Sequence, residues 1–236
     1  MLVKRWEKLP LDLQTEAVRP YYEILRKKKG TLIVKRLFDI VLSIILLLIL
    51  IPLFLALALI IKLDSKGSVF YRQIRVTQYG KQFKIFKFRT MVQNADQIGP
   101  LLTNNNDQRI TKVGSFLRKY RLDEIPQLLN ILTGEMTFVG TRPEVPKYVA
   151  HYTDEMKATL LLPAGVTSRA SIEYKDEESL LTSKDNVDES YINDVLPVKM
   201  GINLIGMTSF NLVTDFIILL STSLGMFKKS MYEESK

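Results

Sequence analysis

An uncharged run of 22 residues, from Ile40 to Ile61, limits what this chain can fold into more than any other feature. A helix rises about 1.5 Å per residue, so a run of this length can cross the roughly 30 Å hydrocarbon core of a bilayer. The run begins too far along the chain and is too long for a secretory signal peptide, and it lacks a small-residue cleavage site. It therefore predicts a segment that enters a membrane.

Two features favour a helix that enters the membrane, breaks and returns to the same face. Pro52 lies near the middle of the run, and proline removes a backbone hydrogen bond and kinks a helix. Both flanks are basic, and the positive-inside rule would keep both of them cytoplasmic. The basic flanking residues are Lys27, Lys28, Lys29, Lys35 and Arg36 before the run, and Lys62, Lys66, Arg72 and Arg75 after it. The alternative is a single-pass anchor with a proline kink, and periodicity alone does not separate the two.

The net charge of +8 is unevenly distributed. Residues 62–121 contain 13 Lys and Arg against 3 Asp and Glu, whereas residues 122–236 contain 10 against 17. The basic first half suggests an anionic partner, and nucleic acid, lipid headgroups and a nucleotide diphosphate all fit. The chain has no cysteine and one histidine, His151, which we expect to be a surface or packing residue. These counts exclude thiolate chemistry and argue against His-based triads and multi-His metal sites.

Two adjacent acids, Asp123 and Glu124, stand just before an apolar helical pattern at residues 125–132. Pro126 fits the first turn of a helix and Gly134 fits its end, so the carboxylates are expected at a helix N-terminus. The helix dipole there favours the ionised form, and an ionised carboxylate can act as a nucleophile or a metal ligand. The structural alternative for Asp123 is a helix cap.

A β-hairpin is predicted upstream of these acids. Residues 69–71 and 83–88 have the composition of strands, with residues 78–81 as the turn between them. The basic side chains of this region suit the binding of a diphosphate, because Arg offers paired donors to phosphate oxygens. They also suit a basic surface that faces a membrane.

The stretch from Arg121 to Pro143 resembles the core of the bacterial sugar transferase family, the monotopic phosphoglycosyl transferases. The matching residues are Asp123, Glu124, Pro126, Gln127 and Leu128, then Gly134 to Gly140, then Arg142 and Pro143. A second string resembles another motif of the family through Gln73, Arg75, Gly80, Lys81, Phe83, Lys87, Phe88, Arg89, Thr90 and Met91. The resemblance extends from about Lys35 to the end of the chain and weakens after Gly165.

The resemblance implies a transferase that moves a phosphosugar from a nucleotide sugar, expected to be a UDP-sugar, onto undecaprenyl phosphate. Asp123 would be the nucleophile that forms an aspartyl-phosphosugar intermediate, and Glu124 with Asp123 would hold Mg²⁺. The residues expected to bind substrate are Arg75, Lys87, Arg89, Arg118, Gln127, Arg142 and Pro143. Arg118 could instead simply satisfy a carboxylate. The product would initiate exopolysaccharide, capsule or glycoconjugate synthesis at the cytoplasmic face of the bacterial cell membrane.

The expected fold is α+β, with a membrane-embedded re-entrant helix-break-helix hairpin, a small cytoplasmic domain of helices with a short β-hairpin, and amphipathic interfacial helices. The expected divisions are an N-terminal amphipathic extension (1–34), the re-entrant helix (35–62, broken at Pro52), the catalytic core (63–165) and a C-terminal segment with a polar excursion and an interfacial helix (166–236). The extension could lie on the membrane or be a solvated helix. Residues 202–227 could be interfacial or could form a second spanning helix. Loops 93–106 and 164–190 are expected to set sugar specificity.

Three rival functions make distinct predictions. A nucleic-acid-binding membrane protein should carry a recognition helix or a stacking platform, and the sequence indicates neither, so no nucleic-acid partner is expected. A non-catalytic scaffold of polysaccharide assembly should have lost the acidic pair or the Arg-Pro motif, and both are intact. A nucleotide-sugar hydrolase would turn over without a lipid acceptor. The sequence gives neither the sugar, the pathway nor the oligomeric state, and it allows a homodimer.

Overall fold

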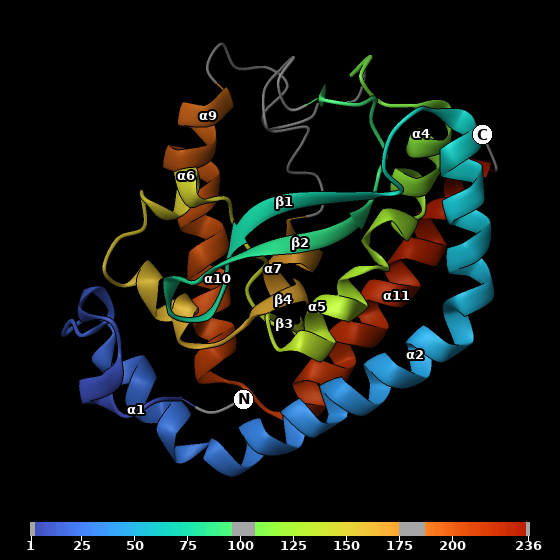
Figure 1. The fold of residues 1–236 in the computed structure, drawn as a ribbon. Coiled ribbons are helices and arrows are strands. Elements are labelled where there is room, and N and C mark those ends of the chain that lie inside the picture. The colour runs from blue at the N-terminus through green and yellow to red at the C-terminus, as the bar shows by residue number, and fades with distance from the viewer. Residues whose placement is uncertain (1–2, 96–106, 175–186, 235–236) are drawn as a thin grey trace.

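The computed structural model describes residues 3–95, 107–174 and 187–234, so parts of both predicted specificity loops, 93–106 and 164–190, lie outside the described residues. Helices and strands are mixed, as predicted (Figure 1). The α-helices are α1 (Arg19–Lys27), α2 (Lys29–Asp64), α4 (Lys112–Lys119), α5 (Gln127–Thr133), α6 (Pro146–Val149), α7 (Arg169–Glu173), α9 (Val187–Ser190), α10 (Leu196–Thr208) and α11 (Leu212–Glu234). The strands are β1 (Phe70–Val76), β2 (Gln82–Phe88), β3 (Met136–Val139) and β4 (Ala164–Thr167). Short 3₁₀ turns are η1 (Trp6–Lys8), η2 (Leu11–Leu13), η3 (Gln78–Gly80), η4 (Leu122–Glu124) and η5 (Met156–Leu161), and η6 (Tyr191–Val195) is a π-helical turn.

The apolar run lies in α2, which is one continuous helix of 36 residues. Pro52 lies inside it, and the helix bends part-way along (Figure 1). The predicted return of this segment to the same membrane face stays a prediction. Proline is the usual cause of such a bend, because its ring clashes with the carbonyl one turn earlier. Among the described residues, α2 is the one helix long and apolar enough to cross a membrane. Most of its large apolar side chains are exposed, which is compatible with a membrane anchor.

Both halves of α2 contact the folded domain through apolar side chains. In the first half, leucines between positions 42 and 50 pack on a core cluster formed by β2, α5 and β3. In the second half, Leu57 and Ile61 are buried with Phe88 of β2 and Leu117 of α4. These contacts lie on either side of Pro52, so the domain itself supports the bent shape.

Charged side chains fasten the first turns of α2 to the domain. Lys28 donates to two carbonyls at the end of α10 at 2.7 and 3.0 Å, and Arg36 donates to the last carbonyls of α5 at 2.6 and 3.0 Å. Lys35 pairs with Asp215 of α11 at 2.5 Å, and the buried Asp39 accepts a hydrogen bond from β3 at 2.6 Å. A cation suits a helix C-terminus, where the carbonyls carry partial negative charge. Three basic residues that the sequence assigned to a cytoplasmic flank are therefore internal anchors.

Two small sheets form the centre of the domain. β1 and β2 pair antiparallel, with Phe70 opposite Phe88, which confirms the predicted hairpin. β3 and β4 pair in parallel, with Met136 beside Ala164, and the sequence analysis did not predict this pair. The second sheet places the chain just after β3 against the chain at the start of β4, at the Gly140–Gly165 contact.

Gly165→Ala is expected to destabilise this contact. A Cβ at Gly165 would lie 2.2 Å from backbone atoms of Gly140, where no flexible side chain can move aside. Overpacking of this kind costs about 1–3 kcal/mol of unfolding free energy. Chemical denaturation in detergent, followed by circular dichroism, measures the change. Gly201→Ala, whose Cβ would meet nothing within 4 Å, is the matched control, and an unchanged midpoint for Gly165→Ala would contradict the close packing.

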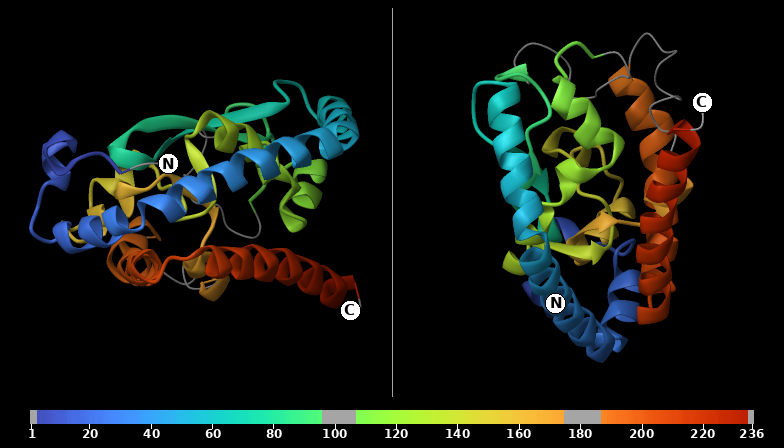
Figure 2. Two further views of the ribbon diagram at one scale, coloured as in Figure 1. Left: turned by 90° about the horizontal axis from the view of Figure 1, so that it is seen from below. Right: turned by 90° about the vertical axis from the view of Figure 1, so that its right-hand side faces the viewer.

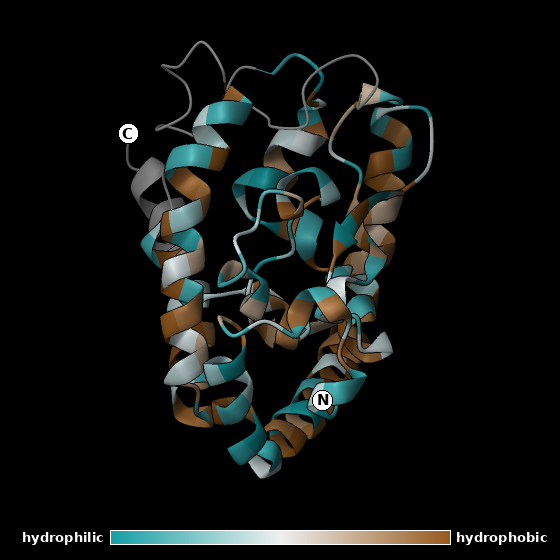
Figure 3. Cartoon of the chain, turned by 90° about the vertical axis from the view of Figure 1, so that its left-hand side faces the viewer, coloured by the Kyte–Doolittle hydropathy of each residue, from teal (hydrophilic) through white to brown (hydrophobic). Residues whose placement is uncertain are grey.

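The N-terminal extension packs on the protein rather than on a membrane. Val18, Tyr22 and Leu25 form the apolar stripe that predicted a surface helix, and all three are buried in a core cluster with residues of α10. The helix formed by η6 and α10, at the left of Figure 3, carries hydrophobic and hydrophilic turns, as expected for a helix with one face in a core. An apolar stripe looks the same in sequence whether protein or lipid covers it, so the interpretation of a membrane-surface helix was wrong about the partner.

α11 keeps one apolar face uncovered. The right-hand view of Figure 2 shows α2 and α11 on opposite sides, with the strands and shorter helices between them. Ile218 and Leu219 of α11 pack on the cluster that the first half of α2 also joins. Among the residues of α11 whose side chains are described, the exposed large apolar ones are Leu212, Val213, Phe216, Ile217, Leu220 and Leu224. The apolar stretch Leu212–Leu224 is shorter than a spanning helix needs.

Candidate active site

The predicted acidic helix start is present, and a tight turn precedes it. α4 ends at Lys119, and Arg121 then adopts a left-handed conformation with a φ of 55°. The turn η4 carries Asp123 and Glu124, and α5 follows and ends before Gly134, whose φ is 87°. Glycine adopts that conformation freely, whereas Arg121 adopts it at a cost, and such strained residues gather at functional sites.

Three cations surround Glu124. Arg142 donates to it from both terminal nitrogens, one of them to Oε2 at 3.1 Å. Lys87 donates to Oε1 at 2.9 Å, and Arg121 Nη1 lies 3.9 Å from the same oxygen. Arg142 also donates to the carbonyl of Val166 at 3.0 Å, which fixes the plane of its guanidinium. The Glu124 side chain is 11% exposed, so these charges meet largely away from water, where their attraction is stronger.

Asp123 lies next to these ion pairs and contacts them through Lys87. Its Oδ2 is 4.0 Å from Lys87 Nζ, and the residue is 7% exposed. Its Oδ1 is buried and has no hydrogen-bond partner among the residues that the structure describes. Leaving a buried carboxylate oxygen without a donor is costly, so this atom is a natural point of contact for a ligand.

The two adjacent carboxyls have pKa values that move in opposite directions. Burial raises the pKa of Asp123, and Lys87 opposes this only in part. Burial also acts to raise the pKa of Glu124, but Arg142 and Lys87 outweigh it and hold that pKa well below its usual range. At Asp123 desolvation is the dominant effect, and it opposes the ionisation that the helix dipole was expected to favour. Neighbouring groups with divergent pKa values are typical of catalytic sites.

The other predicted site residues differ in how they are connected to Asp123 and Glu124. Arg118 donates to Thr90 Oγ1 at 3.0 Å, and its charge also acts on Asp123. Arg75 donates to the carbonyl of Pro143 at 3.1 Å and so supports the segment that carries Arg142. Gln127 is 1% exposed, and neither the oxygen nor the nitrogen of its side-chain amide has a hydrogen-bond partner in the described parts of the chain.

Arg89 makes its shortest hydrogen bonds to Ser65 and not to the acidic pair. Its Nη2 donates to the backbone and side-chain oxygens of Ser65, at 2.7 and 3.0 Å, beyond the end of α2. Its Nε and Nη1 are buried without a partner. Arg89 therefore fastens the second half of α2 to β2, and its predicted contact with substrate stays a prediction.

Comparison with known proteins supplies the family. The model of the family described as bacterial sugar transferase matches residues 30–229 of this chain. The chain belongs to this family.

Curated relatives of the chain are named for transfer to undecaprenyl phosphate or for exopolysaccharide production. The chain is 42% identical over 123 residues to the UDP-N-acetylgalactosamine-undecaprenyl-phosphate N-acetylgalactosaminephosphotransferase of Aeromonas hydrophila, covering 52% of this chain and 29% of that protein. It is 38% identical over 146 residues to the UDP-glucose:undecaprenyl-phosphate glucose-1-phosphate transferase of Klebsiella pneumoniae, covering 60% and 31%. It is 38% identical over 163 residues to the exopolysaccharide production protein ExoY of Sinorhizobium fredii, covering 63% and 72%. The matches span less than a third of the first two relatives.

Sequence reasoning missed Arg121 as a neighbour of the acidic pair and Glu144 as a neighbour of Arg142. Arg121 had a usable signal, since residues three apart in a helical turn face each other and Arg121 stands three before Glu124. Glu144 had none, because its side-chain partners come 47 and 55 residues later in the chain.

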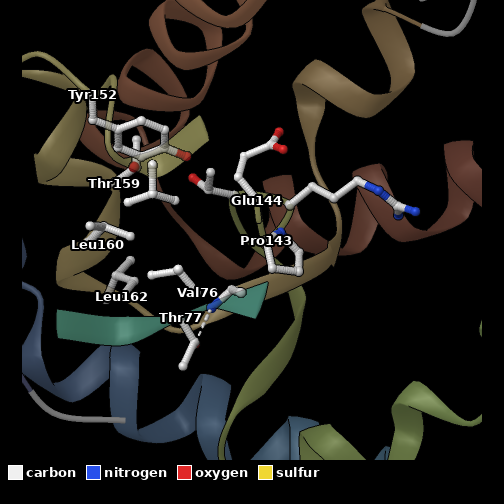
Figure 4. Close-up of a pocket in the computed structure, with 12 residues that line it drawn as sticks. Val76, Thr77, Pro143, Glu144, Tyr152, Thr159, Leu160 and Leu162 are labelled. Carbon is white, nitrogen blue, oxygen red and sulfur yellow. Dashed lines mark hydrogen bonds between the residues drawn. The ribbon is translucent and has the colours of Figure 1, made fainter. Parts of the chain in front are cut away.

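A small pocket lies behind the segment that follows Arg142 (Figure 4). The space between its lining residues is about 240 Å³ when the open solvent at its mouth is included. Pro143 and Glu144 line one side, and Tyr152 and Thr159 line the other. The residues that line it include Arg142 but not the acidic pair, so the pocket is adjacent to the candidate site rather than identical with it.

Asp123 fits Mg²⁺ better than Glu124 does. Mg²⁺ keeps several waters and binds through one or two carboxylates together with substrate phosphates. It therefore needs no cluster of three or more His, Cys, Asp or Glu, and the described residues form none. The unpartnered Oδ1 of Asp123 is a suitable ligand atom, whereas both oxygens of Glu124 are engaged by cations. Glu124 could join a metal site once Arg142 and Lys87 turn to another anion.

Proposed function

We propose that this protein transfers a phosphosugar from a UDP-sugar to undecaprenyl phosphate. The observation that carries the proposal is a buried Asp123 with an unpartnered oxygen, directly next to a Glu124 held by Arg142 and Lys87. The two cations suit the charge of a diphosphate, and the carboxylate suits attack on its phosphorus. The names of the Aeromonas and Klebsiella relatives supply the two substrate classes.

In the proposed reaction, an oxygen of Asp123 attacks the phosphorus that bears the sugar. The bond between that phosphorus and the bridging oxygen breaks, and UMP leaves with the electron pair. A phosphate oxygen of undecaprenyl phosphate then attacks the phosphorus of the aspartyl-phosphosugar and releases the Asp123 carboxylate. Covalent catalysis thus divides one difficult displacement into two easier ones. Burial withdraws water from Asp123, while Lys87, 4.0 Å away, favours its ionised form.

The ion pairs of Glu124 prepare the site for the donor. Glu124 holds Arg142 and Lys87 in place, so less conformational freedom is lost when a diphosphate binds them. The diphosphate competes with the Glu124 carboxylate for Arg142 and Lys87, because both side chains bind phosphate oxygens as well as carboxylate oxygens. Bound Mg²⁺ would neutralise charge on the leaving phosphate.

We further propose that α2 is re-entrant and that the site faces the cytoplasmic side of the membrane. Arg36 near the start of α2 binds α5, and Ser65 at its end binds Arg89 of the same domain. A straight crossing would carry one of these ends, with its contact, to the opposite side of the bilayer. A bend near Pro52 allows both ends to stay on one side, where a soluble donor can meet a lipid acceptor.

Labelling of single cysteines tests this topology, and the natural chain has no cysteine to interfere. Lys27 and Lys66 are exposed residues on either side of the apolar segment. We expect a membrane-impermeant maleimide to modify both Lys27→Cys and Lys66→Cys in inside-out vesicles and neither in right-side-out vesicles. Modification of the two positions from opposite sides would support the single-pass alternative instead.

UMP release from a panel of UDP-sugars, with Mg²⁺ and undecaprenyl phosphate, tests the proposed function. The panel includes UDP-N-acetylgalactosamine and UDP-glucose, the donors named for the relatives. We expect release with one sugar, dependent on the lipid acceptor. Release without the acceptor would favour a nucleotide-sugar hydrolase. No release with any UDP-sugar would contradict the proposed donor and favour the non-catalytic scaffold.

A further inference from the structure

A buried ionic cluster lies behind Arg142 and takes no part in the proposed chemical steps. Tyr191 donates its hydroxyl hydrogen to Glu144 Oε1 at 2.6 Å, and Lys199 Nζ donates to the Tyr191 oxygen at 2.9 Å. Lys199 Nζ also lies 3.4 Å from Glu144 Oε1. Glu144, Tyr191 and Lys199 are 6%, 2% and 7% exposed. A buried ion pair such as Glu144 and Lys199 adds little net stability compared with apolar side chains of similar volume. Stability alone therefore does not explain why this cluster is buried here.

The cluster is connected to Arg142 through a short and well-fastened segment. Pro143, whose ring fixes its own φ, joins Arg142 to Glu144. The carbonyl of Pro143 accepts from Arg75 at 3.1 Å, and the carbonyl of Glu144 accepts from the amide of Val76 at 2.9 Å. The backbone is thus held from β1, and the Glu144 side chain holds the segment from the opposite direction.

Electrostatics gives Glu144 a second effect on Arg142. Burial lowers the pKa of Arg75, Glu144 opposes this, and the neighbouring charge of Arg142 adds to the lowering. Two arginines therefore lie close enough to repel each other, with Glu144 as the anion that both share. Glu124 raises the pKa of Arg142, and Glu144 acts in the same direction. Without Glu144, the repulsion between Arg75 and Arg142 would lose the negative charge that now offsets it.

The C-terminal segment supplies both partners of Glu144. Tyr191 begins the π-helical turn η6, and Lys199 lies eight residues later in α10. In a regular α-helix, residues eight apart point about 80° away from each other. A π turn contains more residues per turn, which brings the two side chains onto one face, and single π turns are frequent at functional sites.

We infer that Glu144, Tyr191 and Lys199 are positioning residues that orient Arg142 toward the phosphates of the donor. The inference rests on the proposed function and deepens it, since it extends the donor site to α10. Residues beyond 166, where the motif resemblance weakens, thereby contribute to catalysis through Arg142 and not by touching the substrate.

Two substitutions in the cluster test the inference in the UMP-release assay. Tyr191→Phe removes one hydroxyl, and Lys199→Met removes the ammonium while keeping most of the side chain. We expect each to lower kcat/KM for the UDP-sugar about 10- to 100-fold, mainly through KM, because a small misplacement of Arg142 weakens donor binding. The KM for undecaprenyl phosphate should not change, and Lys199→Arg should restore most of the activity.

Tyr148→Phe is the matched control. Its ring packs against that of Tyr191 with 4.5 Å between centroids, and its hydroxyl donates to Asp188 at 2.6 Å. It therefore loses a tyrosine–carboxylate hydrogen bond of the same length, made in a partly buried position to Asp188 and not to Glu144. We expect its kinetic constants to match those of the wild type.

Hydrogen exchange provides a readout that does not need turnover. The Val76 amide donates to the carbonyl of Glu144, so it should exchange faster in Tyr191→Phe than in Tyr148→Phe. If the wild type accepts no UDP-sugar, the proposed function fails and the exchange rates alone decide the positioning role. Wild-type exchange in both cluster variants would overturn the inference. An equal effect of Tyr148→Phe, on exchange or on donor KM, would overturn it too.

Discussion

Asp123→Asn is expected to reduce formation of the lipid-linked product by about 10⁴-fold or more, the scale seen when a nucleophile is removed. The amide has nearly the shape of the carboxylate but lacks the charge and the nucleophilic oxygen. Asp123 is only 7% exposed, so a water molecule has little room to take the place of the carboxylate as nucleophile. Lys87 would still hold Glu124, so the surrounding ion pairs should survive the substitution.

Trapping of the covalent intermediate checks this expectation separately from turnover. A donor labelled in its sugar and offered without lipid acceptor should label the wild-type protein and leave Asp123→Asn unlabelled. Asp154→Asn removes the same charge from an exposed pair with Lys157 and should behave as the wild type. Labelling that persists in Asp123→Asn but disappears in Glu124→Gln would exchange the roles of the two acids. Undiminished turnover by Asp123→Asn would sink the assignment of the nucleophile.

The features that the sequence predicted correctly are those set within a few residues. The hairpin of β1 and β2 follows from alternating strand residues and a turn at Tyr79 and Gly80, both of which have positive φ. α5 ends where Gly134 permits a left-handed conformation. The motif that surrounds Asp123 and Glu124 also drew Lys87 and Arg142 into the predicted site, and the fold brings these four together.

The features that escaped prediction depend on partners far along the chain. In the sequence, Lys28 and Arg36 look like charges that flank the apolar run. In the structure, Lys28 binds a carbonyl 180 residues later at the end of α10, and Arg36 binds one 95 residues later near the end of α5. The apolar stripe of α1 gives no indication that α10 will cover it. Tyr191 and Lys199 converge on Glu144 only because a π turn lies between them. Local patterns carry none of these pairings, since they are set by tertiary packing.

Arg142→Met is the second substitution with a large expected effect, lowering kcat/KM for the donor about 10²- to 10³-fold, as for loss of one preorganised donor to a developing charge. Arg142→Lys should recover little of this, because an ammonium cannot reproduce the planar fork that now spans Glu124 and the Val166 carbonyl. Arg19→Gln, which breaks exposed pairs with Glu16 and Glu23 in the N-terminal extension, is the matched control and should leave the kinetics unchanged.

The pH dependence of stability separates two roles for Arg142. Arg142 holds the pKa of Glu124 low, so it stabilises the fold above the unfolded pKa of Glu124, and this is lost as pH falls through the folded pKa. Arg142→Met should therefore melt below the wild type at neutral pH, with a difference that shrinks on acidification. Glu124→Gln leaves Arg142 available for phosphate and should keep more donor affinity than Arg142→Met. Equal loss of donor affinity in Arg142→Met and Glu124→Gln would mean that Arg142 only orders Glu124 and does not bind the donor. A wild-type kcat/KM in Arg142→Met would show that Arg142 is not part of the donor site. Lys87 would then be the cation that binds the diphosphate.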